Sequence, residues 1–138
     1  MSAATSATRA VSANAISKAI VDAAMRVHSA LGPGLLESAY RACLKHELER
    51  RGHSVRAEVP LPVIYEGVKL EIGYRIDLLV NEIVVVEIKA ADGIAPVHEA
   101  QIISYLKLSG RSLGLLINFH VAHLKDGIRR FVVGDGWR

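Results

Sequence analysis

The sequence predicts an α/β or α+β domain in which helices pack against a single layer of β-sheet. Two helical patterns come first, several short strand patterns follow, and a further helical pattern precedes the last two strands. Elements in this order form a sheet covered by helices. The 138 residues fit one domain, and a content of 51% hydrophobic and 22% charged residues is that of a globular protein.

The composition excludes several classes of protein. A single cysteine, Cys43, rules out a disulfide framework and a cysteine-rich zinc site. No apolar run reaches the roughly 18 residues that a transmembrane helix needs. The formal net charge of +3 permits nucleic-acid binding without arguing for it. The aromatic content of 5% speaks against a single-strand binder built on base stacking.

The first residues are small and polar and show no strong apolar periodicity. A signal peptide needs a basic start and a solid apolar stretch, and neither is present. We therefore expect a flexible N-terminal tail over residues 1–13, a single domain over residues 14–138, and a cytoplasmic location.

Two helices are expected after the tail. Apolar residues recur at helical spacing from Asn14, a plausible cap, until Gly32-Pro33-Gly34 ends the pattern. A second helix is expected from about Leu35 to Arg51, before Gly52. One stripe of this helix is apolar. The opposite stripe is expected to be a solvated face, formed by Arg41, Lys45, Glu49 and Arg50.

The period changes towards two after Gly52, which predicts strands. The expected strands are 55–59, 61–65, 68–72, 75–80, 83–88, 112–119 and 128–133. Residues 75–80 and 83–88 are the most apolar of these and are expected at central positions of the sheet, whereas 128–133 is expected at an edge. Between the strands, Pro96 is placed to begin a helix that Gly110 ends.

The two central strands carry charged residues. Glu87 and Lys89 are two residues apart on one strand and therefore share a face, while Asp77 lies on the preceding strand. Charges in a central strand are costly unless they are paired or bound to a metal. Two carboxylates with a lysine could hold a hard cation and activate water at a phosphodiester. The alternative is a Glu–Lys ion pair at the end of a strand.

The metal hypothesis makes a demand on strand register. A two-residue turn at Asn81-Glu82 would pair Asp77 with Val86 and put Glu87 on the opposite face. A three-residue turn over 81–83 would pair Asp77 directly with Glu87. Asn tolerates the left-handed conformation that such turns use, so the hypothesis predicts the longer turn, or a bulge.

Other polar residues could reach the same site. Gln101 and Tyr105 are spaced i, i+4 on one helix face and could donate hydrogen bonds to a phosphate; ordinary surface polarity is the alternative. Glu37 falls in the first turn of a helix, where the dipole favours an acid in any case. Tyr40, one turn further along the same helix, could reach the site or could be a core residue whose hydroxyl is hydrogen-bonded. His98 could contact a phosphate or simply lie on the helix surface.

Taken together, these segments resemble a known family. Residues 34–40 read GLLESAY, a G-x-x-E-x-x-Y motif, and are followed by YRIDLLV, VVVEIKA and HEAQIISYLKLSG. In this order and spacing the chain is similar to the GxxExxY family, a branch of the PD-(D/E)XK nuclease superfamily. The resemblance covers roughly residues 14–133. It implies a restriction-endonuclease-like core, with a central mixed sheet flanked by helices.

The resemblance also implies a function and a set of site residues. The implied activity is that of a Mg²⁺- or Mn²⁺-dependent nuclease, a hydrolase that cleaves phosphodiester bonds of nucleic acid, with DNA favoured. The implied catalytic residues are Asp77, Glu87 and Lys89. The implied metal ligands are Glu37, Asp77, Glu87 and the carbonyl of Ile88. The residues expected to bind substrate are Gln101, Tyr105, Tyr40 and His98.

Two other functions stay open. One is a non-catalytic module that binds nucleic acid or protein and keeps the polar constellation for structure. The other is an oligomeric component of a larger repair or defence complex. A domain of this size has little surface beyond the site with which to grip a long substrate, and a homodimer would double that surface.

Overall fold

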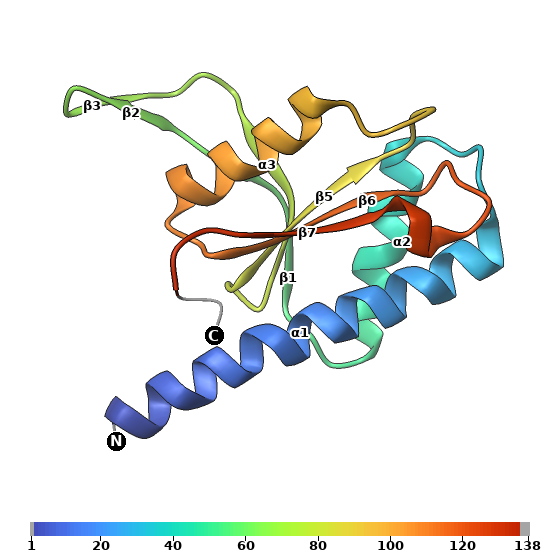
Figure 1. The fold of residues 1–138 in the computed structure, drawn as a ribbon, viewed down its shortest axis with the longest axis horizontal. Helices are drawn as coiled ribbons and strands as arrows, with labels where there is room; N and C mark the ends of the chain where they lie inside the picture. The colour runs from blue at the N-terminus through green and yellow to red at the C-terminus, as the bar shows by residue number, and fades with distance from the viewer. Residues whose placement is uncertain (1, 136–138) are drawn as a thin grey trace.

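The computed structural model describes residues 2–135, with side chains from residue 13 onward, and shows a β-sheet between two layers of helices (Figure 1). The elements are α1 (Ser2–Leu31), α2 (Glu37–Arg50), β1 (Val55–Pro60), β2 (Val63–Tyr65), β3 (Val68–Leu70), β4 (Arg75–Val80), β5 (Val84–Lys89), α3 (Pro96–Ser109), β6 (Leu113–Asn118), η1 (Leu124–Gly127) and β7 (Ile128–Val132). The predicted α/β class is confirmed.

The main sheet has five strands in the order β1-β4-β5-β6-β7. β5 and β6 run parallel, with α3 as the crossover between them, and every other neighbouring pair is antiparallel. The sheet is therefore mixed, with β7 at an edge as predicted. β2 and β3 form a separate two-stranded sheet that extends away from the main one (Figure 1).

Two apolar cores lie on the two faces of the sheet. One is built from α1 and α2 against alternate residues of the strands, such as Leu78, Val80 and Val86. The other places Ile102 and Leu106 of α3 against the opposite face. All six residues of β6 are buried, as are the first five of β5. These near-continuous apolar strands are central because both of their faces are covered.

The first helix begins at Ser2, well before the predicted start at Asn14. The segment before Asn14 lacks apolar periodicity, but it is rich in alanine and contains neither glycine nor proline. High intrinsic propensity permits a helix where an amphipathic pattern does not announce one. Met1 lies outside the described residues, and the flexibility expected for residues 1–13 stays a prediction. Within the described part of the chain, no helix is both long and apolar enough to cross a membrane.

Candidate active site

The turn between β4 and β5 has three residues, as the metal hypothesis demanded. Val80 pairs with Val84, so that residues 81–83 form the turn. Asn81 and Glu82 both have left-handed backbones, with φ of 54° and 59°. Asparagine adopts this conformation more readily than most residues. This register brings Asp77 opposite Glu87.

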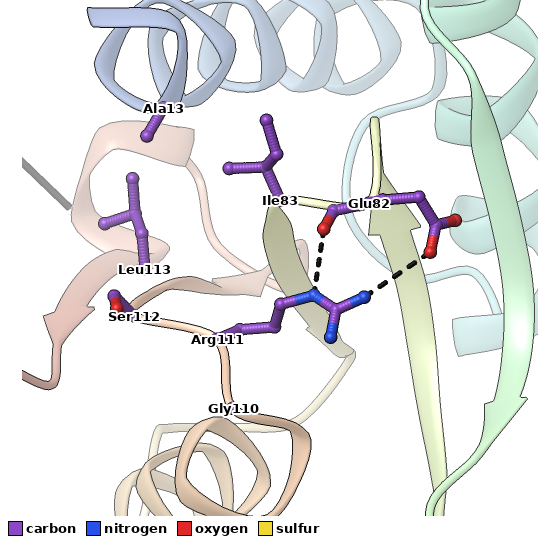
Figure 2. Close-up of a pocket in the computed structure, with 7 residues that line it drawn as sticks. All are labelled: Ala13, Glu82, Ile83, Gly110, Arg111, Ser112 and Leu113. Carbon is purple, nitrogen blue, oxygen red and sulfur yellow. Dashed lines mark hydrogen bonds and ion pairs between the residues drawn. The ribbon is translucent and has the colours of Figure 1, made fainter. Parts of the chain in front are cut away.

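Contacts with two other segments, residues 54–56 and Arg111, hold this turn. The Asn81 Oδ1 atom accepts a hydrogen bond from the backbone N–H of Ser54 at 2.8 Å. Arg56 Nε donates to Glu82 Oε2 at 2.6 Å, and Arg111 Nε donates to the Glu82 carbonyl at 2.9 Å. Figure 2 shows Arg111 reaching Glu82 beside a hollow of about 350 Å³. These contacts lie at the turn, at the other end of the hairpin from Asp77 and Glu87, and fix its register.

The two carboxylates bridge the strands where the regular ladder ends. The last paired residues of β4 and β5 are Leu78 and Val86. Beyond them, Glu87 Oε2 accepts a hydrogen bond from the Asp77 backbone N–H at 2.8 Å. Asp77 Oδ2 accepts one from the Ile88 backbone N–H, also at 2.8 Å. This reciprocal arrangement holds the two carboxylates side by side between the strands.

Glu87 is buried and Asp77 is half-buried, and the charges of Arg41 and Lys89 compensate the two carboxylates only in part. Burial, with the charge of Asp77 adding to it, raises the pKa of Glu87 to about 8, and the side chain is almost fully covered. Burial also raises the pKa of Asp77, although the Ile88 N–H and the charges of Arg41 and Lys89 oppose that shift. Adjacent acids that disfavour each other's ionisation are typical of functional sites. A divalent cation would supply the missing charge.

Lys89 contacts α3 rather than Glu87. Its Nζ donates to Gln101 Oε1 at 3.2 Å, and Gln101 Nε2 donates to the Tyr105 hydroxyl at 3.1 Å. No salt bridge of the described residues joins Lys89 to Glu87. Burial and the charge of Glu87 raise the pKa of Tyr105, so its hydroxyl stays protonated and can donate. The strand-end ion pair considered from the sequence is therefore not formed.

A groove of about 530 Å³ runs along this chain of contacts. Lys89, Gln101 and Tyr105 line it together with His98, so the structure brings these four predicted residues to one surface. The backbone N–H of Ala95 donates to His98 Nδ1 at 3.1 Å, which orients the ring. The groove adjoins the carboxylates through Lys89.

Glu37 approaches the carboxylates from the first turn of α2. Its charge raises the pKa of both Asp77 and Glu87, which places it close to the pair. Among residues whose side chains the structure describes, no group of three or more His, Cys, Asp or Glu is arranged to hold a metal ion. Asp77 and Glu87 are thus the pair of acids that the site offers to a cation directly.

The family is shown by a comparison with protein-family models. The model of the PD-(D/E)XK nuclease superfamily matches residues 14–131, most of the chain. The chain belongs to the PD-(D/E)XK nuclease superfamily. No curated protein and no solved structure matches it. The mixed sheet flanked by helices is consistent with the restriction-endonuclease-like fold of this superfamily, and membership points to nuclease chemistry and a nucleic-acid partner.

The sequence analysis missed Arg41, which lies in the site of this PD-(D/E)XK domain and not on a solvated face. Arg41 Nη1 lies 3.6 Å from Asp77 Oδ1, and its Nη2 lies 3.3 Å from Glu58 Oε1. A signal was present, because Arg41 follows Glu37 by four residues and residues i and i+4 share a helix face. Placing Glu37 at the site should have placed Arg41 there too.

Glu58 was also missed, and nothing in the sequence marks it. It stands opposite Asp77, between the pairs Ala57↔Leu78 and Val59↔Ile76, with a left-handed φ of 52°. A left-handed residue other than glycine costs about 1–2 kcal/mol. An exposed ion pair contributes about 0–1 kcal/mol to stability, so the contact with Arg41 does not offset the cost of the left-handed backbone. Such uncompensated strain clusters at functional sites.

The strain at Glu58 changes the direction of the strand. Val55 packs into the core beside α1 and α2, whereas Val59 packs against the core beside α3. In a regular strand, residues four apart lie on the same face. The left-handed residue between them therefore reverses the alternation next to the carboxylates.

A third missed residue, Asn118, fixes the segment that follows Lys89. Asn118 lies beside Lys89 in the parallel pair of β5 and β6 and is buried. Its Nδ2 donates to the Ala91 carbonyl at 2.9 Å, and its Oδ1 accepts from the Ala91 N–H at 3.2 Å. Gly127 packs against it so closely that a Cβ at that position would lie 2.2 Å from the Asn118 carbonyl oxygen. The path of the chain from Lys89 towards α3 depends on these contacts.

Tyr40 is not brought to the site. Its side chain is fully buried and stacks on Phe119 with a centroid distance of 4.5 Å. The hydroxyl donates to the Gly32 carbonyl at 2.5 Å and accepts from the Leu35 N–H at 3.1 Å. Both contacts close the loop between α1 and α2. The structure thus corresponds to the core alternative and not to the predicted substrate contact.

Proposed function

We propose that this protein is a Mg²⁺- or Mn²⁺-dependent nuclease of the GxxExxY branch that hydrolyses phosphodiester bonds in DNA. The observation that carries the proposal is the pair of carboxylates, buried Glu87 and half-buried Asp77, that accept reciprocal backbone hydrogen bonds across β4 and β5. Membership of the nuclease superfamily supports the reaction class. The motif around Gly34, Glu37 and Tyr40 supports the branch.

The donor set fits a hard divalent cation. Mg²⁺ is commonly held by one or two carboxylates, with waters and substrate phosphate completing the coordination. Asp77 and Glu87 would hold it, with the Ile88 carbonyl as a further ligand and Glu37 acting on a bound water. When bound, the cation would lower the pKa of a water molecule and neutralise charge on the phosphate.

The residues of the chain supply the remaining functions. Lys89, held by Gln101, would orient the attacking water or stabilise charge that develops on the phosphate. Gln101, Tyr105 and His98 would position the nucleic-acid strand along the groove that they line. We further propose a cytoplasmic homodimer, since two copies would double the surface that grips a long substrate.

A cleavage assay with a matched lysine control tests the proposal. Single- and double-stranded DNA and RNA are incubated with Mg²⁺, Mn²⁺ or EDTA. We expect metal-dependent cleavage by the wild type, its loss in Lys89→Ala, and its retention in Lys45→Ala, since Lys45 pairs with Glu49 on the exposed face of α2. Cleavage that survives both EDTA and Lys89→Ala would contradict the proposal. Binding without cleavage would favour the non-catalytic module.

A further inference from the structure

We propose that Arg41 binds the scissile phosphate and that Glu58 is the positioning residue that holds its guanidinium for that contact. The inference deepens the proposed nuclease function and rests on it, because it assigns a phosphate ligand to the same site. Neither residue was predicted from the sequence to lie in the site.

Arg41 is placed to release the Asp77 carboxylate and bind a substrate phosphate in its place. Its contact with Asp77 Oδ1, at 3.6 Å, is longer than a hydrogen bond and is therefore an electrostatic attraction. A guanidinium has five N–H donors, so most remain available to a further acceptor. A cation bound to Asp77 would weaken the attraction that holds Arg41 there. A phosphate would then offer two oxygens in the geometry that arginine binds best.

The position of Arg41 complements that of Lys89. Arg41 projects from α2, which packs on one face of the sheet, while Lys89 contacts Gln101 of α3 on the other. α2 and α3 cover opposite faces of the sheet (Figure 1). Arg41 therefore reaches Asp77 from the α2 side, whereas Lys89, on β5, is held towards the α3 side. Two cations that flank a metal site can contact different oxygens of one phosphodiester.

Glu58 is the second anchor of the guanidinium. Its carboxylate lies 3.3 Å from Arg41 Nη2, and its side chain is 59% exposed. Its left-handed backbone costs more than such an exposed pair returns, so the pair alone does not explain why the conformation is kept. Glu58 stands directly opposite Asp77, so the strained residue and the metal-binding acid hold Arg41 from two adjacent strands.

Binding of a fluorescent DNA duplex in Ca²⁺, measured by anisotropy from 50 to 200 mM salt, counts the phosphate contacts. The slope of log K against log salt is negative, and losing one contact reduces its magnitude by about 0.9. We expect that decrease in Arg41→Ala and no change in Lys45→Ala. Glu58→Gly should keep the wild-type slope, because Arg41 is still present. Glycine accepts a left-handed φ, so this variant keeps the backbone of β1.

Steady-state cleavage rates, measured against substrate concentration in Mg²⁺, test the positioning role. Losing one preorganised donor in a transition state costs about 10²–10³-fold in rate. We expect a decrease of that size in Arg41→Ala, partial recovery in Arg41→Lys, and a smaller decrease in Glu58→Gly with an unchanged KM. If the pair of Arg41 and Glu58 only stabilised the fold, Glu58→Gly would lower the melting temperature but would not lower kcat at an unchanged KM.

The outcomes separate this inference from the proposed function. If Arg41→Ala and Glu58→Gly bind and cleave like the wild type while Lys89→Ala is inactive, the inference is wrong and the nuclease proposal stands. If the wild type does not cleave with either metal, the proposed function fails, and an unchanged salt slope in Arg41→Ala would also reject the phosphate contact. If Arg41→Ala does not fold, Arg41→Lys and Glu58→Gly decide the result.

Discussion

Glu47 and Glu87 are both glutamates with little exposed surface, but their neighbours carry opposite charges. Glu47 on α2 accepts hydrogen bonds from Arg51 at 2.7 Å and from Arg50 at 3.0 Å. Those two guanidinium groups hold the pKa of Glu47 below its usual value. Glu87 instead lies beside a second carboxylate, Asp77, and burial together with that charge raises its pKa to about 8.

The different surroundings of the two acids separate a structural role for Glu47 from a different role for Glu87. Arg50 and Arg51 lie on the same stretch of chain as Glu47, so its charge is compensated locally. The reciprocal hydrogen bonds of Glu87 and Asp77 join the strands, but placing buried Glu87 next to a second acid makes its ionisation unfavourable. An acid kept in such surroundings is best explained by a ligand that compensates the charge when it binds.

Glu87→Gln should have the largest effect. It preserves the shape and hydrogen-bonding capacity of the side chain but removes the charge that a cation requires. We expect cleavage to be abolished and the rise in melting temperature with saturating Mg²⁺ to disappear, while the fold survives. Thermal melts with and without Mg²⁺ measure this. A wild type that Mg²⁺ does not stabilise, together with a clearly destabilised variant, would contradict the nuclease proposal.

The pH dependence of metal-free stability should follow the raised pKa of Glu87. The folded state favours the protonated form of Glu87. The contribution of this form to the free energy of unfolding is fully present below the unfolded pKa of 4.5 and is lost as pH rises towards about 8. At about 1.4 kcal/mol per pKa unit, the loss amounts to a few kcal/mol. Urea unfolding in EDTA from pH 4.5 to 8.5 measures it. Glu87→Gln should flatten the profile, and a wild-type profile that is equally flat would refute the buried-acid interpretation.

Asn118→Ala should have an intermediate effect that links packing to the site. It removes both partners of the Ala91 backbone and leaves partly buried polar groups unsatisfied, which costs about 1–3 kcal/mol. Because the segment after Lys89 loosens, we also expect a lower kcat. Denaturant unfolding and single-turnover cleavage measure the two effects. Unchanged kcat in a destabilised variant would show that Asn118 supports the fold alone.

Glu47→Gln should have the smallest effect and serves as the matched control for Glu87→Gln. Because the pKa of Glu47 is lowered, its stabilisation is present above pH 4.5 and is lost as pH falls below that value. We expect a slight decrease in melting temperature at pH 7, none at low pH, and unchanged cleavage. A loss of cleavage comparable to that of Glu87→Gln would remove the contrast between the two acids.

Local signals predicted much of the fold and the register that brings Asp77 opposite Glu87. Pro96 and Gly110 mark α3, whose observed bounds are Pro96–Ser109. The need to bring Asp77 and Glu87 together predicted a three-residue turn, which the structure confirms. These predictions depend on residues close in the sequence, where turn length and side-chain alternation suffice.

The missed residues depend on contacts between distant segments. Arg41 reaches Asp77 from a helix that precedes β4 by one strand and a hairpin, and Asn118 reaches Ala91 across the parallel pair. No propensity marks the left-handed backbone of Glu58. Tyr40 shows the converse: its motif suggested a site residue, and only the packing against Phe119 revealed its place in the core.

The side-chain bridges between β4 and β5 also make the hairpin intolerant of misalignment. Sliding β4 by one residue would turn Leu78 and Val80 away from their own core and push the Asp77 carboxylate towards the apolar layer under α1 and α2. The shifted strand would lose both reciprocal bonds to β5 at the same time. A chain that folds in the wrong alignment is thus inactive and unstable for one and the same reason. Quality control that removes unstable chains would therefore remove inactive ones as well.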